Sequence, residues 1–104
     1  RALQQLLPRL LADGRATLPI AARALHVSPR TLQRRLAAHN ISWQTFLDQA
    51  RARLAQEYLG DTSLSLSDVA LLLGFSEQSA FNRAFRRWTG STPGRERRLQ
   101  GMRR

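Results

Sequence analysis

Two short segments of the chain carry hydrogen-bonding side chains at helical spacing. SPRTLQRRL covers residues 28–36, and SEQSAFNRAFRR covers residues 76–87. In each segment two large apolar side chains stand four residues apart, as Leu32 and Leu36 do, and arginines are set against them. Arg, Gln and Asn side chains offer paired donors or acceptors that match the edges of guanine and adenine, and Arg also binds phosphate. These residue types therefore indicate the chemistry of nucleic-acid recognition.

Drawn at 100° per residue, each segment forms a helix with one apolar and one polar face. The side chains predicted to face a core are Leu32, Leu36, Phe81, Phe85 and Trp88. The opposite face of the first helix carries Arg30 and Arg34, with Thr31 nearby and Gln33 and Arg35 on the flanks. The opposite face of the second helix carries Ser79, Arg83, Arg86 and Arg87, with Asn82 on the flank and Gln78 at the exposed N-terminal end. A plain solvated surface is the alternative interpretation, and it explains one such face more easily than two.

The composition agrees with a polyanion as the partner. Of the 104 residues, 17 are basic and all of these are Arg, against 7 acidic residues, which gives a net charge of +10 and a pI of about 12.0. Basic charge alone would also suit a membrane surface or serve solubility. The chain has no Cys, and neither His26 nor His39 has an acidic partner nearby in the sequence. We therefore predict no enzyme activity, no cofactor and no metal site.

Helical periodicity extends over almost the whole chain, which predicts an all-α fold of about seven helices. In the first half of the chain we expect a Leu-rich helix over 2–12 closed by Asp13-Gly14, and then helices capped by Thr17 and by Ser28. A long helix over 43–59 should end at Gly60. In the second half we expect a short helix that begins with the capping box of Ser65 and Asp68 and ends at Gly74, and a helix that is capped by Ser76 and stopped by Gly90 and Pro93. Pro8 is predicted to start, kink or end the first helix, and Asp48 with Arg51 has the spacing of a structural ion pair.

Part of the chain is repeated. Ala22, Leu25, His26, Val27 and Ser28 match Ala70, Leu73, Gly74, Phe75 and Ser76, and after one extra residue in the second copy Leu32, Arg34 and Leu36 match Phe81, Arg83 and Phe85. Each copy predicts a short helix, a tight turn and a second helix. A small residue suits the close crossing of two helices, and the turn requires a residue that tolerates positive φ. The pattern is that of a helix-turn-helix, present twice.

The motif SPRTLQRRL, followed by GFSEQSAFNRAFRRWTGSTP, resembles the C-terminal DNA-binding domain of the AraC/XylS transcriptional regulators over roughly residues 15–98. The resemblance implies two helix-turn-helix subdomains joined by a long helix. It also implies recognition helices, over 29–38 and 77–88, that enter successive major-groove segments on one face of the DNA. Glu96 stands where the family usually has Tyr, so the docking of the last helix is not implied. We expect the subdomains to cover residues 1–41 and 60–104, with the linking helix at 42–59.

Candidate site residues follow from the resemblance and from the two polar faces. The resemblance implies base contacts from Arg30, Gln33, Arg34, Gln78, Ser79 and Arg83, and the neighbouring Thr31 and Asn82 complete the predicted base-contacting set. Phosphate contacts are predicted for Ser28 and Ser76 at the helix N-termini and for Arg35, Arg86 and Arg87.

The sequence thus predicts a sequence-specific, double-stranded DNA-binding domain of a bacterial transcriptional regulator, located in the cytoplasm at the nucleoid. Two alternatives stay open: a nonspecific nucleic-acid binder, and an interaction module that contacts RNA polymerase. Because the chain starts at Arg1 rather than Met, we expect a fragment of a longer protein, with effector binding and dimerisation on an N-terminal domain. No membrane partner is expected, since no apolar run approaches about 20 residues. Activation and repression are not distinguished.

Overall fold

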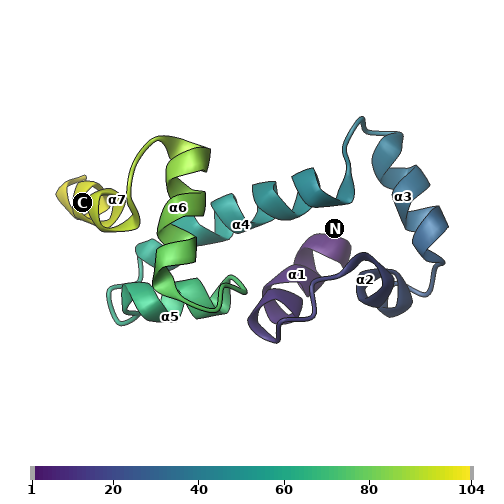
Figure 1. Cartoon of the computed structure of the whole chain (residues 1–104), viewed down its shortest axis with the longest axis horizontal. Coiled ribbons are helices and arrows are strands. Elements are labelled where there is room, and N and C mark those ends of the chain that lie inside the picture. Colours follow the sequence, from purple (N-terminus) through teal and green to yellow (C-terminus); the bar gives the residue numbers. More distant parts are fainter. Residues whose placement is uncertain (1, 104) are drawn as a thin grey trace.

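The computed structural model describes residues 2–103, and its regular secondary structure there is entirely α-helical (Figure 1). The helices are α1 (Ala2–Ala12), α2 (Leu18–Ala24), α3 (Pro29–Ala37), α4 (Trp43–Leu59), α5 (Leu66–Leu72), α6 (Gln78–Thr89) and α7 (Pro93–Met102). The predicted all-α fold with about seven helices is confirmed. The molecule measures 43 × 25 × 24 Å, and α4 runs along its long axis, with α3 beyond one end and α6 crossing near the other.

Side-chain caps fix the starts of most helices. The hydroxyls of Thr17, Ser28 and Ser65 accept hydrogen bonds from backbone N–H groups in the first turn of α2, α3 and α5, as predicted. Ser65 and Asp68 form both bonds of a capping box. Each of these signals acts within three residues, so the local sequence is enough to specify it.

One local prediction was wrong, and another holds only in its remaining alternative. Ser76 is not the N-cap of α6: the cap residue is Glu77, which makes no side-chain capping bond, and the helix begins at Gln78. The cause is the extra residue of the second copy, which moves Ser76 one position too far from the helix to bond its first turn. Of the three roles predicted for Pro8, the start and the end of α1 are excluded because the helix runs through this residue, and a kink stays a prediction. Leu7 and Leu11, on either side of Pro8, are almost fully buried, and their burial offsets the missing N–H bond.

The helices enclose two connected clusters of buried side chains. The smaller cluster contains Ala21, Ala22, Leu32 and Leu36 of α2 and α3, while the larger joins α1, α4, α5 and α6. Helix α1 serves both, since Leu7 and Leu11 lie in the larger cluster and other leucines of α1 pack against the smaller one. Trp43 and Phe46 of α4 also pack against both. The division into residues 1–41, 42–59 and 60–104 stays a prediction.

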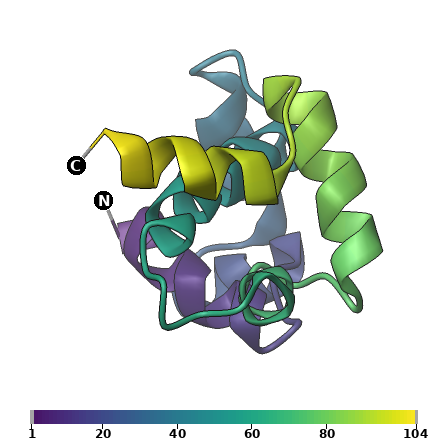
Figure 2. The ribbon, with the colours of Figure 1, turned by 90° about the vertical axis from the view of Figure 1, so that its left-hand side faces the viewer.

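Helix α7 docks across the end of α4, a contact that the sequence did not imply. Seen from that end, α7 lies in front of α4 (Figure 2). Arg97 donates from Nε to the carbonyl of Leu59 at 2.9 Å and from Nη2 to that of Asp61 at 3.2 Å. Gln100 donates to the carbonyl of Gln56 at 3.2 Å. A cationic side chain therefore satisfies the free carbonyls at the C-terminus of α4, where the helix dipole is negative.

We expect the substitution Arg97→Met to loosen α7 and lower stability, because it leaves the carbonyls of Leu59 and Asp61 without their charged donor. The expected cost is about 1.5–3 kcal/mol, typical of hydrogen bonds to charged groups. At about 4–8 °C per kcal/mol for a domain of this size, thermal denaturation followed by circular dichroism would detect it. Arg98→Met, an exposed neighbour on the same helix, is the control and should change little. Equal melting temperatures for the two variants would contradict this role of Arg97.

Candidate nucleic-acid interface

The first helix pair, α2 and α3, is joined by a turn at residues 25–28. His26 takes a positive φ of 60°, and the Val27 N–H donates to the carbonyl of Ala22 at 3.0 Å. Ala22 is fully buried, which lets the two helices cross closely. Leu32 and Leu36 anchor α3 against α2, at 4% and 8% exposure. The polar face of α3 is therefore held outward, as predicted.

The second pair, α5 and α6, repeats this geometry. Gly74 has a φ of 91°, and the Phe75 N–H donates to the carbonyl of Ala70 at 3.0 Å, the counterpart of the bond at Ala22. Phe81 and Phe85 are fully buried. A Cβ on Gly74 would lie 3.1 Å from a backbone carbonyl of α1, so both φ and space favour glycine here. The matched bonds confirm that the repeat is a structural one.

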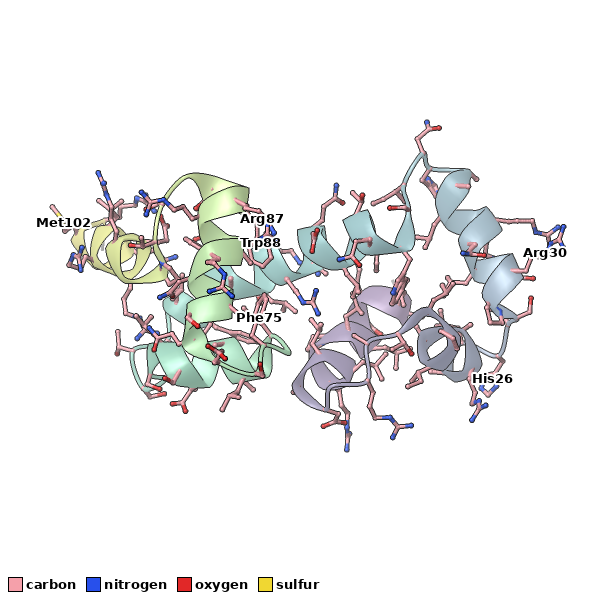
Figure 3. The ribbon with its side chains drawn as sticks, viewed as in Figure 1. His26, Arg30, Phe75, Arg87, Trp88 and Met102 are labelled. Atoms are coloured by element: carbon pink, nitrogen blue, oxygen red, sulfur yellow. The ribbon has the colours of Figure 1, made fainter. Side chains whose placement is uncertain are left out.

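The outer face of α3 is open to solvent. Arg30, Gln33, Arg34 and Arg35 are exposed and Thr31 is half-buried. Arg30 projects outward beyond the end of the molecule (Figure 3). The hydroxyl of Ser28 accepts from the Thr31 N–H and donates to the Thr31 hydroxyl at 2.9 Å. Ser28 thus already holds the first turn of α3, and its own hydroxyl proton is engaged.

The outer face of α6 is also exposed, but its N-terminal end is less free than predicted. Ser76, Ser79, Arg83, Arg86 and Arg87 are exposed. Gln78, expected at an exposed end, is half-buried, and its side-chain oxygen accepts from the Ser67 hydroxyl of α5 at 3.0 Å. The Ser79 hydroxyl donates to the Glu77 carboxylate. Asn82 is half-buried on the flank, with its Oδ1 lacking a hydrogen-bond partner.

Both outer faces carry a net positive charge, although the Glu77 carboxylate lies at the N-terminal end of α6. Neither α3 nor α6 contains an acidic residue. The ion pairs within residues 2–103 join Asp48 to Arg51 and Glu96 to Arg103. The six candidate arginines on the two faces, Arg30, Arg34, Arg35, Arg83, Arg86 and Arg87, take part in neither. Their charge is available to a polyanion, and backbone amides at the helix N-termini add partial positive charge.

Other kinds of site find little support in the part of the chain that the structure describes. No group of three or more His, Cys, Asp or Glu side chains within residues 2–103 could hold a metal ion. Over the same range, no helix has both the length and the apolar character needed to span a bilayer.

A protein-family model described as a helix-turn-helix domain matches residues 21–99, a span that contains the C-terminal part of α2 and all of α3, α4, α5 and α6. The chain belongs to the AraC/XylS family. It is a DNA-binding domain of a transcriptional regulator, as the sequence predicted, and the family and fold are those of regulators rather than of enzymes.

Individual relatives agree with this assignment. Over 94 residues the AraC/XylS-family domain is 45% identical to the HTH-type transcriptional regulator VirS of Mycobacterium tuberculosis, covering 90% of this chain and 28% of VirS. Over 73 residues it is 52% identical to the ornithine utilization regulator of Pseudomonas aeruginosa, covering 70% of this chain and 22% of that protein. The chain therefore spans less than a third of either relative.

Among solved structures, the C-terminal domain of AraT, a response regulator from Geobacillus stearothermophilus, superposes with a TM-score of 0.78 at 30% identity. The superposition covers 95% of this chain and 83% of that domain. The match thus includes the AraC/XylS-family domain almost from end to end.

Two tertiary contacts near the candidate interface could not be predicted from the sequence. Asp48 and Arg51 form the predicted pair, with 3.9 Å between Nη1 and Oδ1. The same arginine also reaches the carbonyl of Leu73, 22 residues away. The bond between Ser67 and Gln78 likewise joins different helices. Spacing along one helix gives no signal for either contact, although the presence of an arginine beside the buried stripe of α4 is compatible with an interior role.

Proposed function

We propose that the domain binds one specific double-stranded DNA site, with α3 and α6 in successive major-groove segments on one face of the duplex. The observation that carries this proposal is the placement of two matched helix pairs at the two ends of α4, each with an exposed, unpaired arginine face. Helix α4 has 17 residues, or about 25 Å at 1.5 Å per residue. Successive groove segments recur every 34–36 Å or so, which a molecule 43 Å long can span.

Within this proposal each face divides into two kinds of contact. The proposed base-contacting residues are Arg30, Thr31, Gln33, Arg34, Gln78, Ser79, Asn82 and Arg83. The proposed phosphate-contacting residues are Ser28, Arg35, Ser76, Arg86 and Arg87. In the absence of DNA, Gln78 accepts a hydrogen bond from Ser67, and Ser79 donates one to Glu77. On binding, Gln78 and Ser79 would either exchange these bonds for base contacts or keep them and orient the N-terminal end of α6. Base contacts would select the sequence, and phosphate contacts would set the register of the protein on the duplex.

A selected duplex, a scrambled duplex and an RNA competitor would test the proposal. We expect strong preference for the selected duplex, bound by a monomer of this chain across roughly 20 base pairs, two turns at about 10.5 each. Equal competition by all three would instead favour nonspecific binding. An obligate dimer on a palindrome, seen by sedimentation, would contradict the asymmetric arrangement.

The affinity should also fall steeply with salt. Each phosphate neutralised by an arginine contributes about −0.9 to the slope of log K against log salt, so Arg35, Arg86 and Arg87 alone would give about −2.7. Titrations of the selected duplex at several salt concentrations would measure the slope. An affinity almost independent of salt would rule out this mode of DNA binding.

Further partners belong to the full-length protein. We propose that effector binding and dimerisation reside outside this domain, consistent with the 28% and 22% of VirS and of the ornithine utilization regulator that it spans. RNA polymerase is proposed as a second partner of the regulator, and Leu71 on α5, at 57% exposure, is a surface feature that suits a protein contact. We propose the cytoplasm, at the nucleoid, as the location, and no catalytic activity.

A further inference from the structure

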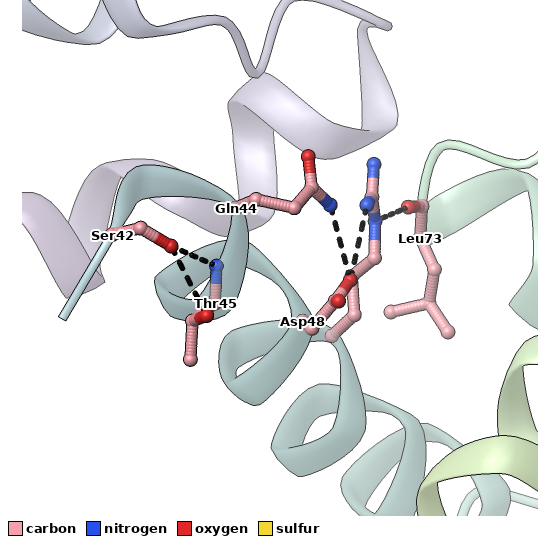
Figure 4. Close-up of polar contacts among 6 residues, drawn as sticks. Ser42, Gln44, Thr45, Asp48 and Leu73 are labelled. Carbon is pink, nitrogen blue, oxygen red and sulfur yellow. Dashed lines mark hydrogen bonds and ion pairs between the residues drawn. The ribbon is translucent and has the colours of Figure 1, made fainter.

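One arginine of the domain is turned inward, against the second helix pair. Arg51 of α4 donates from Nε to the carbonyl of Leu73 at 3.1 Å, and its guanidinium carbon lies 5.4 Å from the centre of the Phe75 ring. Its Nη1 is 3.9 Å from Asp48, whose carboxylate also accepts from Gln44 at 3.3 Å. Figure 4 shows the contacts at Asp48 and Leu73. The guanidinium therefore ties α4 to the turn between α5 and α6.

The environment of Arg51 differs from that of the arginines on α3 and α6. Its side chain is 20% exposed. Burial lowers the pKa of its guanidinium, and the Asp48 carboxylate opposes that change. An arginine stays charged in proteins, so the structure keeps a partly buried cation at a cost in solvation. The carbonyl, the ring and the carboxylate compensate for that cost.

The turn that Arg51 contacts is enclosed on a further side. A Cβ on Gly74 would lie 3.1 Å from the carbonyl of Leu11 and 3.6 Å from Nη2 of Arg51. The end of α1, the middle of α4 and the turn before α6 thus meet at one point. In the first pair, no described side chain of α4 donates to the corresponding turn at His26. The two pairs are held differently although their internal geometry matches.

We propose that Arg51 is a positioning residue: it fixes the orientation of α6 on α4, and so sets the spacing of the two groove segments that the domain recognises. Leu73 is the C-cap of α5, and α6 begins five residues later. Holding the Leu73 carbonyl and the Phe75 ring together leaves the turn little freedom to rotate α6. The role of Arg51 in the spacing rests on the proposed function, whereas its role in the orientation of α6 does not.

The orientation is tested without DNA. The chain has no cysteine, so nitroxide labels can be attached at Ala37→Cys on α3 and Arg83→Cys on α6, and the distance between them measured by pulsed electron paramagnetic resonance. We expect a narrow distribution in the parent, and a broadened or shifted one when Arg51→Met is added. The matched control is Arg53→Met, an exposed residue on the same helix, which removes the same charge. A distribution unchanged by Arg51→Met would overturn the proposal.

The spacing is tested with unlabelled protein on duplexes that differ by one inserted or deleted base pair between the two segments. Each step turns the second segment by about 34°. On a duplex with one inserted or deleted base pair, the parent and Arg53→Met should lose about tenfold or more in affinity, as for one misplaced base contact. Arg51→Met should lose less than about threefold in affinity on the same duplex. A purely stabilising role of Arg51 would weaken binding to every duplex by the same factor, and that result would refute the inference.

If Arg51→Met does not fold, Phe75→Leu replaces it in both measurements, since it removes the ring under the guanidinium and keeps an apolar side chain. The distance distribution should then broaden and the spacing penalty fall, each less than for Arg51→Met. No change in either would count against the proposal. A parent without any preferred duplex would disprove the proposed function alone, because the distance measurement still decides the role of Arg51.

Discussion

Replacement of Phe85 by alanine is expected to unfold the second helix pair. Phe85 is fully buried, its ring centre is 5.8 Å from that of Phe81 and 6.5 Å from that of Trp88, and both contacts are edge-to-face. Truncation of a buried Phe costs about 3–5 kcal/mol, comparable to the whole stability of a small domain. Phe81→Ala should behave alike, because Phe81 is equally buried and also packs on Phe75 at 5.8 Å.

Thermal melting and near-ultraviolet circular dichroism of the two variants would measure this loss. Leu71→Ala is the matched control: the side chain is apolar and lies in the same helix pair, but it is 57% exposed, so it should change stability by less than about 0.5 kcal/mol. If either Phe variant melted within a few degrees of the parent, the apolar face of α6 would not contribute the expected stability to the core.

The second large effect is expected for Arg83→Ala on the preferred DNA site. Arg83 is exposed on the outer face of α6 and has no ion-pair partner within residues 2–103. If it reaches a guanine edge, its loss should cost about 1–3 kcal/mol on that site and relax selectivity at one base position. Affinities for the preferred duplex and for its single-base variants would show this pattern.

Arg87→Ala supplies the comparison, since Arg87 lies one turn further from the N-terminus of α6. We expect it to weaken binding to all sequences about equally and to reduce the salt slope by about one unit, as for a phosphate contact. Both variants should keep the melting temperature of the parent. If both variants lost the same affinity on every duplex, Arg83 would be a phosphate contact, and base selection would rest mainly on Arg30 and Arg34.

Local interactions account for what the sequence predicted well. A cap joins residues three apart, and a helical stripe repeats every three or four, so Ser28, Ser65 and the burial of Phe81 and Phe85 were all predictable from neighbours. The prediction that Ser76 caps α6 was wrong because capping depends on position to within one residue. The additional residue of the second copy places Glu77, and not Ser76, directly before α6. The outward direction of the arginine faces followed from the inward direction of the apolar ones.

Contacts between distant segments were beyond such reasoning. Arg97 bonds a carbonyl 38 residues earlier, and Arg51 one 22 residues later. Both side chains sit in arginine-rich stretches where composition alone suggests a solvent or phosphate role. Gln78 was expected to be free because nothing in its own helix engages it, whereas its partner Ser67 belongs to α5. In each case a tertiary approach decides which polar group is available.

The position of α1 shows that the span matched by the family model and the folding unit do not coincide. The family match begins at residue 21, yet Leu7 and Leu11 fill the core beneath α5 and α6, at 0% and 1% exposure. Trimming the protein to residues 21–99 would therefore open a void far along the chain from the cut, under the second helix pair. A domain transplant cut at the bounds of the family model would therefore destabilise the second helix pair, although it keeps every residue of that pair.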